Sequence, residues 1–401
     1  MKSVKSLALT KAWAGKQEIK NLRKVAERIK KAVKRKEKII LYGDADLDGV
    51  ASVIILKEAI KNLSGPTRNG YLISAVYFPD REVEGYGISE KGLNYLKKIA
   101  PALLIALDCG IGNFKEVKIA NKFGFEVIII DHHEVLDELP KASLIVDPKQ
   151  RGDKYPFKEL ANAGLSFKLS ELLLKGNLTE NLRKNFLELV AIATIADMMP
   201  REDENKIFIE EGLKSIENSW RPGIRTLFEE KTFNSYLNLN QKISKIISIL
   251  NIRDVENNFP ASFRLLTSPD LEESKKIISR LIEKREIRKQ KIIEIIQEIE
   301  ERIQKGSNPI IFEGDSSWDF TLISSVASII CQRYQKPTFI YKILKDESQG
   351  TVRVPAGINS VALMKKCSKY PITYGGHPLA SGFRIKNENL EKFKKCLIDN
   401  L

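Results

Sequence analysis

Three aspartates occur at alternate positions in LYGDADLDGV, which covers residues 41–50. They are Asp44, Asp46 and Asp48, and they follow directly on a run of aliphatic residues. Carboxylates this close repel one another unless a positive charge lies between them. Carboxylate oxygens are also the ligands that hard divalent cations prefer. The segment therefore predicts either a metal site or a strained turn.

Calcium binding is one alternative, because DADLDG matches the first six positions of an EF-hand loop. Counted from Asp44, the twelfth position is Ile55, where an EF-hand requires a bidentate glutamate. The segment also follows a strand-like run instead of a helix. The EF-hand is therefore excluded. Any single aspartate could still be a turn or helix cap, so the prediction depends on the other acids.

Further acidic and histidine side chains follow other apolar segments. Asp108 ends ALLIALD, and Asp131, His132 and His133 end EVIIID and begin the next loop. Asp197 follows an apolar helical pattern in IATIADMMP. Carboxylates with one or two imidazoles and no thiolate suit Mn²⁺ or Mg²⁺ better than zinc. Their joint placement favours one metal centre over several unrelated turns.

The chain has only three histidines, and the third, His377, lies in YGGHPLASG. A lone histidine is most often a core or surface residue, but histidines grouped with acids and glycines indicate chemistry. Gly375 and Gly376 would let the backbone approach an anion closely, with His377 directed toward it. This segment predicts a phosphate contact.

The elements that must position these residues alternate between aliphatic runs and helical patterns from residue 38 to 148. This alternation is typical of βαβ units, in which the carboxyl ends of parallel strands meet at one edge of the sheet. The predicted strands are 38–43, 72–78, 102–108, 126–131 and 143–148, and the predicted helices are 49–63, 89–99, 160–175 and 180–196.

A long helix is predicted after Pro269 and Asp270, because isoleucines and leucines keep helical spacing as far as Gly306. It would be a rod of roughly 50 Å, long enough to bridge two domains. Beyond it, strands at 309–314, 338–342, 351–355 and 381–385 and a helix at 320–334 predict a second, smaller α/β unit.

Positive charge is concentrated at the amino terminus. The formal net charge is +14, and residues 1–36 hold 13 lysines and arginines against two glutamates. Apolar residues from Ile19 to Val33 recur at helical spacing, which predicts a packed stripe beneath a basic face. That face is either a solvated helix surface or an electrostatic contact for nucleic acid. An anionic membrane is disfavoured, because the stripe lacks bulky aromatics after Trp13.

The sequence also bears on the compartment. No apolar run approaches the roughly 20 residues that cross a bilayer, and the N-terminal LAL is too short for a signal peptide. A cytoplasmic protein is therefore predicted. Cys109, Cys331, Cys367 and Cys396 show no CxxC pairing, which favours reduced thiols over disulfides or a zinc site.

Together, GDADLDG, LDCG, DHHE, ADMMP and GGHPLASGF resemble the five motifs of the DHH phosphoesterase superfamily with a DHHA1 domain, specifically the RecJ-like single-strand nucleases of the archaeal type. The resemblance implies an α/β fold, with a parallel-sheet DHH domain and a smaller α/β DHHA1 domain joined by a long helix. The expected parts are a basic N-terminal helical segment (1–37), the DHH catalytic domain (38–268), the connecting helix (269–306) and the substrate-binding DHHA1 domain (307–401).

The resemblance also implies a binuclear metal site. One cation would be held by Asp44, Asp46 and Asp108, and the other by Asp48, Asp108, His132 and Asp197, with Asp108 bridging the two. The residues implied as catalytic are Asp46, Asp108, His132 and His133.

Outside the metal ligands, the resemblance implies roles in substrate binding. His133 would contact the developing phosphoryl charge, and Asp131 would orient the motif. The residues implied to bind substrate phosphates are His133, Arg353, Gly375, Gly376 and His377.

The implied activity is metal-dependent hydrolysis of single-stranded nucleic acid by a 5′ to 3′ single-stranded DNA exonuclease in DNA repair or replication. Two divalent cations are expected, Mn²⁺ first and Mg²⁺ second. Two alternatives stay open: a nanoRNase-like phosphodiesterase for short oligonucleotides, and a replisome scaffold protein. The expected partners are single-stranded DNA or RNA and a helicase or replisome protein, with no membrane.

Overall fold

The computed structural model describes residues 18–64, 73–81, 83–135, 138–231, 238–303 and 308–401. The chain divides into two compact units, residues 1–282 (unit 1) and 283–401 (unit 2). The predictions made for residues 1–17, for Leu72 and for the end of the long helix at 304–306 lie outside the described residues.

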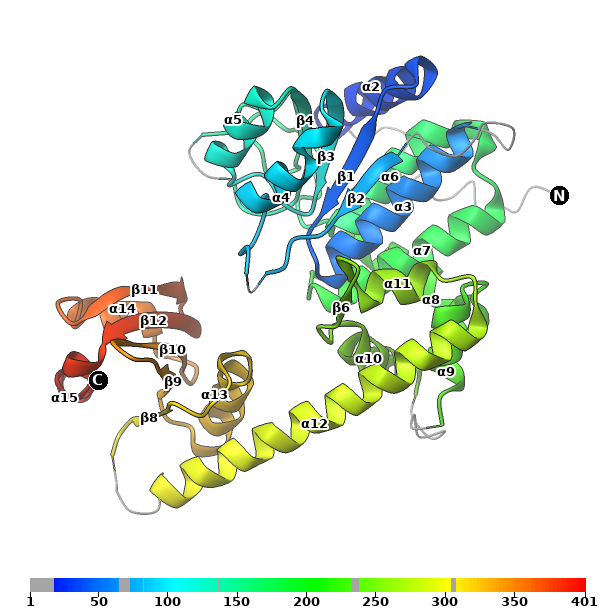
Figure 1. Cartoon of the computed structure of the whole chain (residues 1–401). Helices are drawn as coiled ribbons and strands as arrows, with labels where there is room; N and C mark the ends of the chain where they lie inside the picture. Colours follow the sequence, from blue (N-terminus) through cyan, green and yellow to red (C-terminus); the bar gives the residue numbers. More distant parts are fainter. Residues whose placement is uncertain (1–17, 65–72, 82, 136–137, 232–237, 304–307) are drawn as a thin grey trace. The chain divides into compact units, whose positions relative to one another are not determined.

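A parallel sheet forms the centre of unit 1 (Figure 1). Its strands are β1 (Ile39–Gly43), β2 (Ile73–Tyr77), β3 (Ala102–Leu107), β4 (Phe125–Ile130) and β5 (Leu144–Val146). They lie in the order β2-β1-β3-β4-β5, and every neighbouring pair is parallel. The strands predicted from aliphatic runs are confirmed, each to within two residues.

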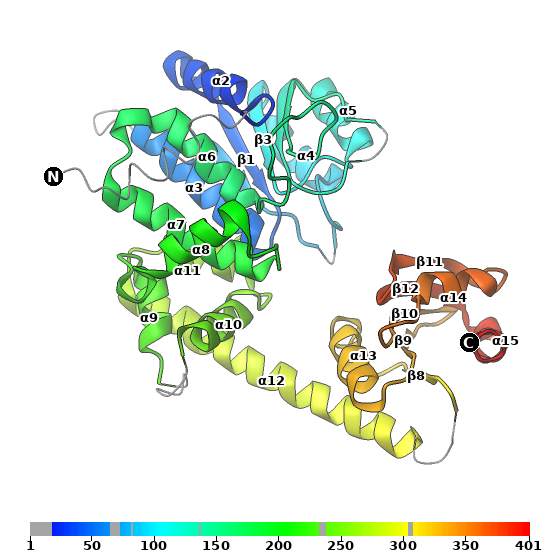
Figure 2. The same ribbon diagram turned by 180° about the vertical axis from the view of Figure 1, so that it is seen from behind.

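Both faces of this sheet are buried, which explains why its strands are continuous aliphatic runs and not alternating ones. Leu41 and Ile105 join the core on one face, whereas Ile40 and Leu104 join the core on the other. The helices over the first face are α2 (Leu22–Arg35), α3 (Leu47–Ser64), α6 (Asn162–Leu174) and α7 (Glu180–Ala196); those over the second are α4 (Glu90–Leu96) and α5 (Phe114–Lys122) (Figure 1, Figure 2).

In the described part of unit 1, four further helices were not identified in the sequence. They are α8 (Asp203–Leu213), α9 (Pro222–Glu229), α10 (Leu239–Leu250) and α11 (Ala261–Thr267), with a small hairpin of β6 (Val255–Glu256) and β7 (Phe259–Pro260) before α11. The helix α10 begins with a capping box, in which Asn238 accepts from the backbone of Gln241.

The predicted long helix is α12 (Leu271–Ile303), and its 33 residues correspond to roughly 50 Å. Its first turns belong to unit 1, where Ile277, Ile278 and Leu281 join the core. Its later turns belong to unit 2, where Ile296 and Ile299 pack with α13 (Phe320–Tyr334). The isoleucine stripe is therefore explained by packing at both ends of the helix.

Unit 2 contains a second five-stranded sheet in the order β11-β12-β10-β9-β8. Its strands are β8 (Ile311–Asp315), β9 (Thr338–Ile343), β10 (Glu347–Arg353), β11 (Pro371–His377) and β12 (Ala380–Lys386). Only the pair of β8 and β9 is parallel. The helix α13 packs on one face, and the unit also contains α14 (Ser360–Lys366) and α15 (Leu390–Asp399).

The prediction of reduced thiols is wrong for one pair. Cys367, which follows α14, and Cys396, in α15, form a disulfide, whereas Cys109 and Cys331 are free and buried. The two bonded cysteines are 29 residues apart, so no local spacing could reveal the pair.

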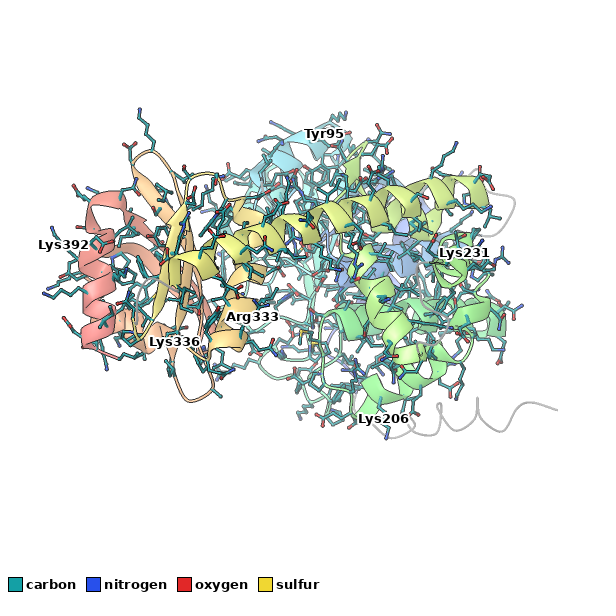
Figure 3. All side chains as sticks on the ribbon, turned by 90° about the horizontal axis from the view of Figure 1, so that it is seen from below. Tyr95, Lys206, Lys231, Arg333, Lys336 and Lys392 are labelled. Atoms are coloured by element: carbon teal, nitrogen blue, oxygen red, sulfur yellow. A yellow bond between two sulfur atoms is a disulfide. The ribbon has the colours of Figure 1, made fainter. Side chains whose placement is uncertain are left out.

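On α15, the helix that carries Cys396, Lys392 projects outward from the ribbon (Figure 3).

Within the described parts of the chain, no helix combines the length and the apolar character that crossing a membrane requires.

Candidate metal centre

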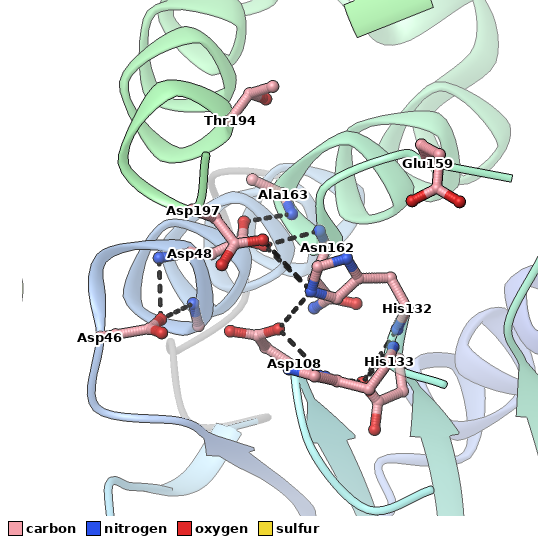
Figure 4. Close-up of polar contacts among 12 residues, drawn as sticks. Asp46, Asp48, Asp108, His132, His133, Glu159, Asn162, Ala163, Thr194 and Asp197 are labelled. Atoms are coloured by element: carbon pink, nitrogen blue, oxygen red, sulfur yellow. Dashed lines mark hydrogen bonds and ion pairs between the residues drawn. The ribbon is translucent and has the colours of Figure 1, made fainter. Parts of the chain in front are cut away.

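The acids and histidines singled out in the sequence meet at the carboxyl edge of the parallel sheet (Figure 4). Asp44 follows β1, Asp108 follows β3, and His132 follows β4 with one residue between. The helix α7 delivers Asp197 from its carboxyl end. Chain segments far apart in sequence thus converge because parallel strands all end at the same edge.

The loop after β1 is shaped by its own aspartates. Asp46 Oδ1 accepts the backbone N–H groups of Asp48 and Gly49, each at 3.0 Å, and so caps the start of α3. A Cβ atom on Gly49 would lie 2.4 Å from the carbonyl oxygen of Asp44. The glycine is therefore required for the tight turn that brings Asp44 and Asp46 to the same side.

Asp48 connects this loop to α6. Its two carboxylate oxygens accept the backbone N–H groups of Asn162, at 2.7 Å, and Ala163, at 2.8 Å (Figure 4). Both donors belong to the first turn of α6, whose N–H groups have no partner within the helix. Asp48 thereby fixes the distance between α3 and α6 while its carboxylate remains next to His132.

His132 lies at the centre of the cluster and is buried. Its Nε2 atom is 3.1 Å from Asp108 Oδ1, 3.6 Å from Asp197 Oδ2 and 3.7 Å from Asp48 Oδ2. Neither His132 Nε2 nor Asp108 Oδ1 has a hydrogen-bond partner among the described residues. Ligand atoms about 2.1 Å from one metal ion are typically about 3 to 3.5 Å apart. These residues therefore fit a divalent cation.

Two groups of potential ligands consist of residues from the two predicted sets. Asp44, Asp46 and Asp108 form one group, and Asp48, His132 and Asp197 form another, with the ligand atoms of each group within 4.8 Å of one another. Asp108 also groups with His132 and His133. A carboxylate shared by neighbouring groups is the arrangement that a bridging ligand requires.

Asp108 has a positive φ of 63°. This left-handed conformation is disfavoured for residues other than glycine, although aspartate and asparagine tolerate it best. Such strain is typical of functional sites, where the surrounding structure holds it in place. Here Asp131 contributes, because its Oδ2 accepts the backbone N–H of Ile111 at 3.0 Å and so holds the loop that carries Asp108.

Burial and neighbouring charges shift the pKa values of the acids and of His132 in this cluster. Burial raises the pKa of Asp48 and Asp108 well above the usual value, and neighbouring aspartates raise both further. Burial, followed by the charge of Asp46, raises the pKa of Asp197 to about 6. Burial lowers the pKa of His132 to about 4. A neutral imidazole with a free lone pair among carboxylates is the state in which these ligands bind a metal ion.

His133 differs from His132 in exposure and in charge. It is 42% exposed, and its Nδ1 lies 2.7 Å from Asp131 Oδ1. Burial acts to lower the pKa of His133, but the hydrogen bond and charge of Asp131 outweigh it and raise the pKa. His133 is thus the more cationic of the two imidazoles, and it faces outward where a substrate anion could approach.

Two residues at the site were not assigned a role from the sequence. The Tyr86 hydroxyl donates to the carbonyl oxygen of Asp108 at 3.0 Å and contacts His133 Nδ1 at 3.0 Å. Arg81 donates to Asp44 Oδ1 at 3.0 Å and to Asp46 Oδ2 at 2.9 Å. Arg81 lies four residues after the end of β2, so the rule that located Asp44 and Asp108 could have found it, whereas Tyr86 lies nine residues after that strand.

A cleft of about 370 Å³ opens beside the cluster. Its lining includes Asp46, Asp48 and Asp197 and also Arg81 and Arg253. Arg253 also forms an ion pair with Asp80, at 2.6 Å. A cleft that is lined by both carboxylates for cations and guanidinium groups has the charges needed to hold a phosphodiester.

The remaining predicted site residues belong to unit 2. Arg353 of β10 is paired with Ala380 of β12, and Ala380 is paired with His377 of β11, so Arg353 and His377 lie at the same end of the sheet. The guanidinium of Arg353 donates to Ser324 Oγ at 2.6 Å and to Ser328 Oγ at 3.1 Å. No carboxylate pairs with Arg353 among the described residues.

Gly375 and Gly376 lie in β11 next to His377. Gly376 has a φ of 131°, and a Cβ atom there would lie 2.7 Å from the carbonyl oxygen of Ala380. The glycine is therefore needed for the close pairing of β11 with β12 itself. Gly375 has open space on its Cβ side, which leaves its backbone accessible.

Comparison with known proteins finds two matching domain families. The model of the DHH family, N-terminal domain, matches residues 38–194, and the model of the DHHA1 domain matches residues 306–401. Single-stranded-DNA-specific exonuclease RecJ of Bacillus subtilis is 32% identical over 386 residues, which are 95% of this chain and 48% of that protein. RecJ of Escherichia coli is 25% identical over 404 residues, 94% of this chain and 69% of that protein. The chain thus spans about half the length of the Bacillus relative.

Solved structures give the same fold. Exonuclease RecJ bound to manganese superimposes with a TM-score of 0.75 at 24% identity, over 96% of this chain and 94% of that chain. RecJ from Thermus thermophilus in complex with Mn²⁺ gives a TM-score of 0.77 at 24% identity, over 96% of this chain and 55% of that chain. The predicted fold class is confirmed.

Proposed function

Because this chain belongs to the DHH family and carries a DHHA1 domain, we propose that it is a metal-dependent phosphodiesterase that hydrolyses single-stranded nucleic acid. Its first substrate is single-stranded DNA, degraded from the 5′ end in DNA repair or replication. The preference for DNA is supported by the 32% identity to a relative named as a single-stranded-DNA-specific exonuclease. The 5′ polarity is inferred from the resemblance to RecJ-like nucleases.

One observation carries this proposal. Asp108 Oδ1 and His132 Nε2 are buried, 3.1 Å apart and without a hydrogen-bond partner among the described residues, and they lie among four further carboxylates. A buried polar pair of this kind is costly unless a cation completes it. We assign Asp44, Asp46 and Asp108 to one cation and Asp48, Asp108, His132 and Asp197 to a second, with Mn²⁺ preferred and Mg²⁺ as the alternative.

When bound, two such cations supply a nucleophilic water and neutralise the charge that develops on the phosphate oxygens. The chain's own residues position the substrate. His133, whose pKa Asp131 raises, donates a hydrogen bond to a phosphoryl oxygen. The Tyr86 hydroxyl donates to the carbonyl oxygen of Asp108 and contacts the His133 ring, and Asp131 holds Nδ1 of the same ring.

In this proposal, residues of unit 2 bind the nucleic-acid substrate. Arg353 has hydroxyl groups but no carboxylate around it within the described residues, so its charge is free for a phosphate. The backbone of Gly375 and Gly376 and the neighbouring His377 lie at the same end of the sheet and complete the phosphate contacts.

Two other functions remain as alternatives. An enzyme for short oligonucleotides would keep the same ligands, and only substrate length separates it from an exonuclease on long strands. A scaffold in a replisome would not need the ligands, and their joint presence disfavours this as the sole role. We propose that the enzyme acts in the cytoplasm, and that a helicase or replisome protein is a partner.

The test is a time course on 5′-labelled and 3′-labelled single-stranded DNA and RNA with Mn²⁺, Mg²⁺ or EDTA. The matched control is Asp108→Asn, because asparagine keeps the volume and tolerates the positive φ of this position, whereas alanine would add backbone strain. Shortening that requires metal and is lost in Asp108→Asn supports the nuclease. Early release of the 5′ label from DNA supports the polarity.

Other outcomes would refute parts of the proposal. Cleavage confined to di- to tetranucleotides would replace it with the short-oligonucleotide enzyme. Cleavage of neither long nor short strands, with Mn²⁺ still bound, would favour the scaffold.

A further inference from the structure

The helix α2 has one apolar and one basic face. Its buried residues are Leu22, Val25, Ala26, Ile29, Ala32 and Val33. They pack against α6, α3 and β5 in the core of unit 1. The opposite face is exposed and basic, and Glu27 is the single acid in the helix. Packing explains the apolar face, but a helix that is only a solvated surface usually carries charges of both signs.

The basic residues that flank the apolar face have partners. Arg28 forms ion pairs with Glu126, at 2.7 Å, and with Glu37, at 2.5 Å. The Lys30 ammonium donates to the carbonyl oxygen of Leu172 at 2.7 Å, close to the carboxyl end of α6. These contacts fix the orientation of α2 on the domain, so its outer face is held in one direction.

The outermost basic residues differ from these. Lys24, Lys31, Lys34 and Arg35, which we call the basic row, are exposed and form no ion pair with any carboxylate in the part of the chain that the structure describes. Lys175, beside the end of α6, adds a further positive charge near the helix. Glu27 lies three positions after Lys24 and four before Lys31, but positive charges still outnumber it along the row. An excess of like charges destabilises the folded domain, and a polyanion would remove that repulsion.

The spacing of the row fits an extended anion. Lys24 and Arg35 are eleven positions apart on the same side of the helix, which corresponds to roughly 16 Å. Lys31 and Lys34 fill the interval between them. A row of flexible ammonium groups along a rod matches successive phosphates of a backbone, whereas a compact anion would need a pocket.

We propose that the basic row of α2 binds the phosphate backbone of the nucleic-acid substrate, independently of its sequence and outside the candidate metal centre. The inference rests on the proposed function and extends it to a second binding surface. The carboxyl end of α2 leads into the amino end of β1, whereas the metal centre lies at the carboxyl end of β1. A strand of two or three nucleotides cannot reach both, so the basic row acts only on longer strands.

The experiment uses the full chain with four substitutions, Lys24→Gln, Lys31→Gln, Lys34→Gln and Arg35→Gln. Glutamine has a helix propensity similar to that of lysine and arginine, and the apolar face is left intact. The matched control removes four exposed lysines elsewhere in unit 1, through Lys91→Gln, Lys98→Gln, Lys118→Gln and Lys122→Gln. Both variants have the same net charge, so they separate position from total charge.

Binding of a fluorescent single strand of about 30 nucleotides is measured in EDTA by anisotropy over a range of salt concentrations. Each phosphate contact on a single strand contributes about 0.7 to the slope of log affinity against log salt. For the basic-row variant we expect a slope lower by roughly 2 to 3 and binding at least about tenfold weaker at low salt. The control should keep the slope of the intact protein. Equal slopes in the two variants would overturn the inference.

Two further measurements keep the result interpretable. A variant with Lys24→Arg, Lys31→Arg and Lys34→Arg preserves charge and should keep the slope; loss of binding there would point to disrupted packing and refute the electrostatic interpretation. If the fourfold variant fails to fold by circular dichroism, Lys31→Gln alone should lower the slope by about 0.7, and no change would contradict the inference.

The remaining arms separate this inference from the proposed function and from a membrane. Cleavage of dinucleotides and trinucleotides with Mn²⁺ should be unchanged in the basic-row variant. Salt-dependent binding without cleavage of any strand would leave the inference standing and refute the proposed function. Loss of sedimentation with phosphatidylglycerol vesicles, together with unchanged DNA binding, would replace nucleic acid by a membrane as the occupant.

Discussion

Individual aspartates at the carboxyl edge of the sheet both stabilise the local structure and serve as candidate metal ligands. Asp46 caps α3 and Asp48 holds the first turn of α6, yet both carboxylates remain within reach of a cation. Asp131 belongs to none of the candidate metal groups among the described residues, but it holds both neighbouring loops. Folding and metal binding therefore depend on the same side chains. A substitution is informative only when it preserves either the structural hydrogen bonds or the candidate metal ligand.

Asp131→Asn separates orientation from ligation. The backbone N–H of Ile111 would then face an amide N–H instead of a carboxylate oxygen, and His133 would lose the charge that raises its pKa. We expect the kcat for single-stranded DNA to fall roughly 10-fold to 100-fold and the activity to decline at a lower pH than in the intact protein. Asp399→Asn, at the surface of unit 2, is the control. An unchanged pH profile would contradict the positioning role of Asp131.

Asp147 is a buried acid just after β5, and burial raises its pKa to about 7. A raised pKa means that the folded protein holds the proton more tightly than the unfolded chain, so stability falls as the pH rises from about 4 to about 7. Asp147→Asn should therefore gain roughly 2 to 4 kcal/mol at pH 8 and little at pH 4.

The substitution at Asp147 keeps the oxygen that accepts the backbone N–H of Lys149 at 2.7 Å. Urea unfolding in EDTA at both pH values measures the effect. An equal change at pH 4 and pH 8 would show that the carboxylate is not the cause.

At the scale of elements, the close packing of α7 on α8 determines where Asp197 lies. A Cβ atom on Gly212 of α8 would lie 2.1 Å from the carbonyl oxygen of Leu187 and 2.7 Å from Ala191 in α7. Only a glycine allows the two helices to approach this closely. Because Asp197 ends α7, a shift of this helix moves a candidate ligand.

Gly212→Ala should therefore destabilise unit 1 by about 1 to 3 kcal/mol and weaken Mn²⁺ binding as well. Calorimetric titration with Mn²⁺ and thermal unfolding measure the two effects. Gly176→Ala is the matched control, because nothing lies within 4 Å of a Cβ atom at that glycine. Normal metal affinity in a destabilised Gly212→Ala protein would show that α7 can shift without moving Asp197.

At the scale of the whole molecule, the two units are stabilised differently. Unit 1 is completed by helices on both faces of its sheet, whereas unit 2 carries the disulfide between Cys367 and Cys396. A crosslink that closes a loop of 29 residues stabilises mainly by restricting the unfolded chain, by roughly 3 to 4 kcal/mol.

Cys367→Ser with Cys396→Ser, or treatment with a reductant, should lower the unfolding temperature of unit 2 only. Mn²⁺ should raise the unfolding temperature of unit 1 only, because its candidate ligands among the described residues all belong to that unit. Calorimetry of the intact chain, in the four combinations of metal and reductant, records both transitions. A reductant effect on the transition that Mn²⁺ raises would refute this assignment.

The sequence by itself determined the strands of the first sheet, the long helix and the residues that gather at the candidate metal centre. It could do so because buried parallel strands are continuous aliphatic runs and because their carboxyl ends share one edge. Asp44, Asp108 and His132 are each identified by a strand that comes just before them. These signals are local, and each is contained in about ten neighbouring residues.

Only the tertiary structure decided what depends on contacts between distant segments. The disulfide of Cys367 and Cys396, the placement of Tyr86 beside His133 and the close approach at Gly212 have no local signature, because each depends on how two elements pack. The same holds for the basic row of α2. Its positive charge can be counted in the sequence, but only packing shows that Arg28 is paired and that Lys24 and Lys31 face outward.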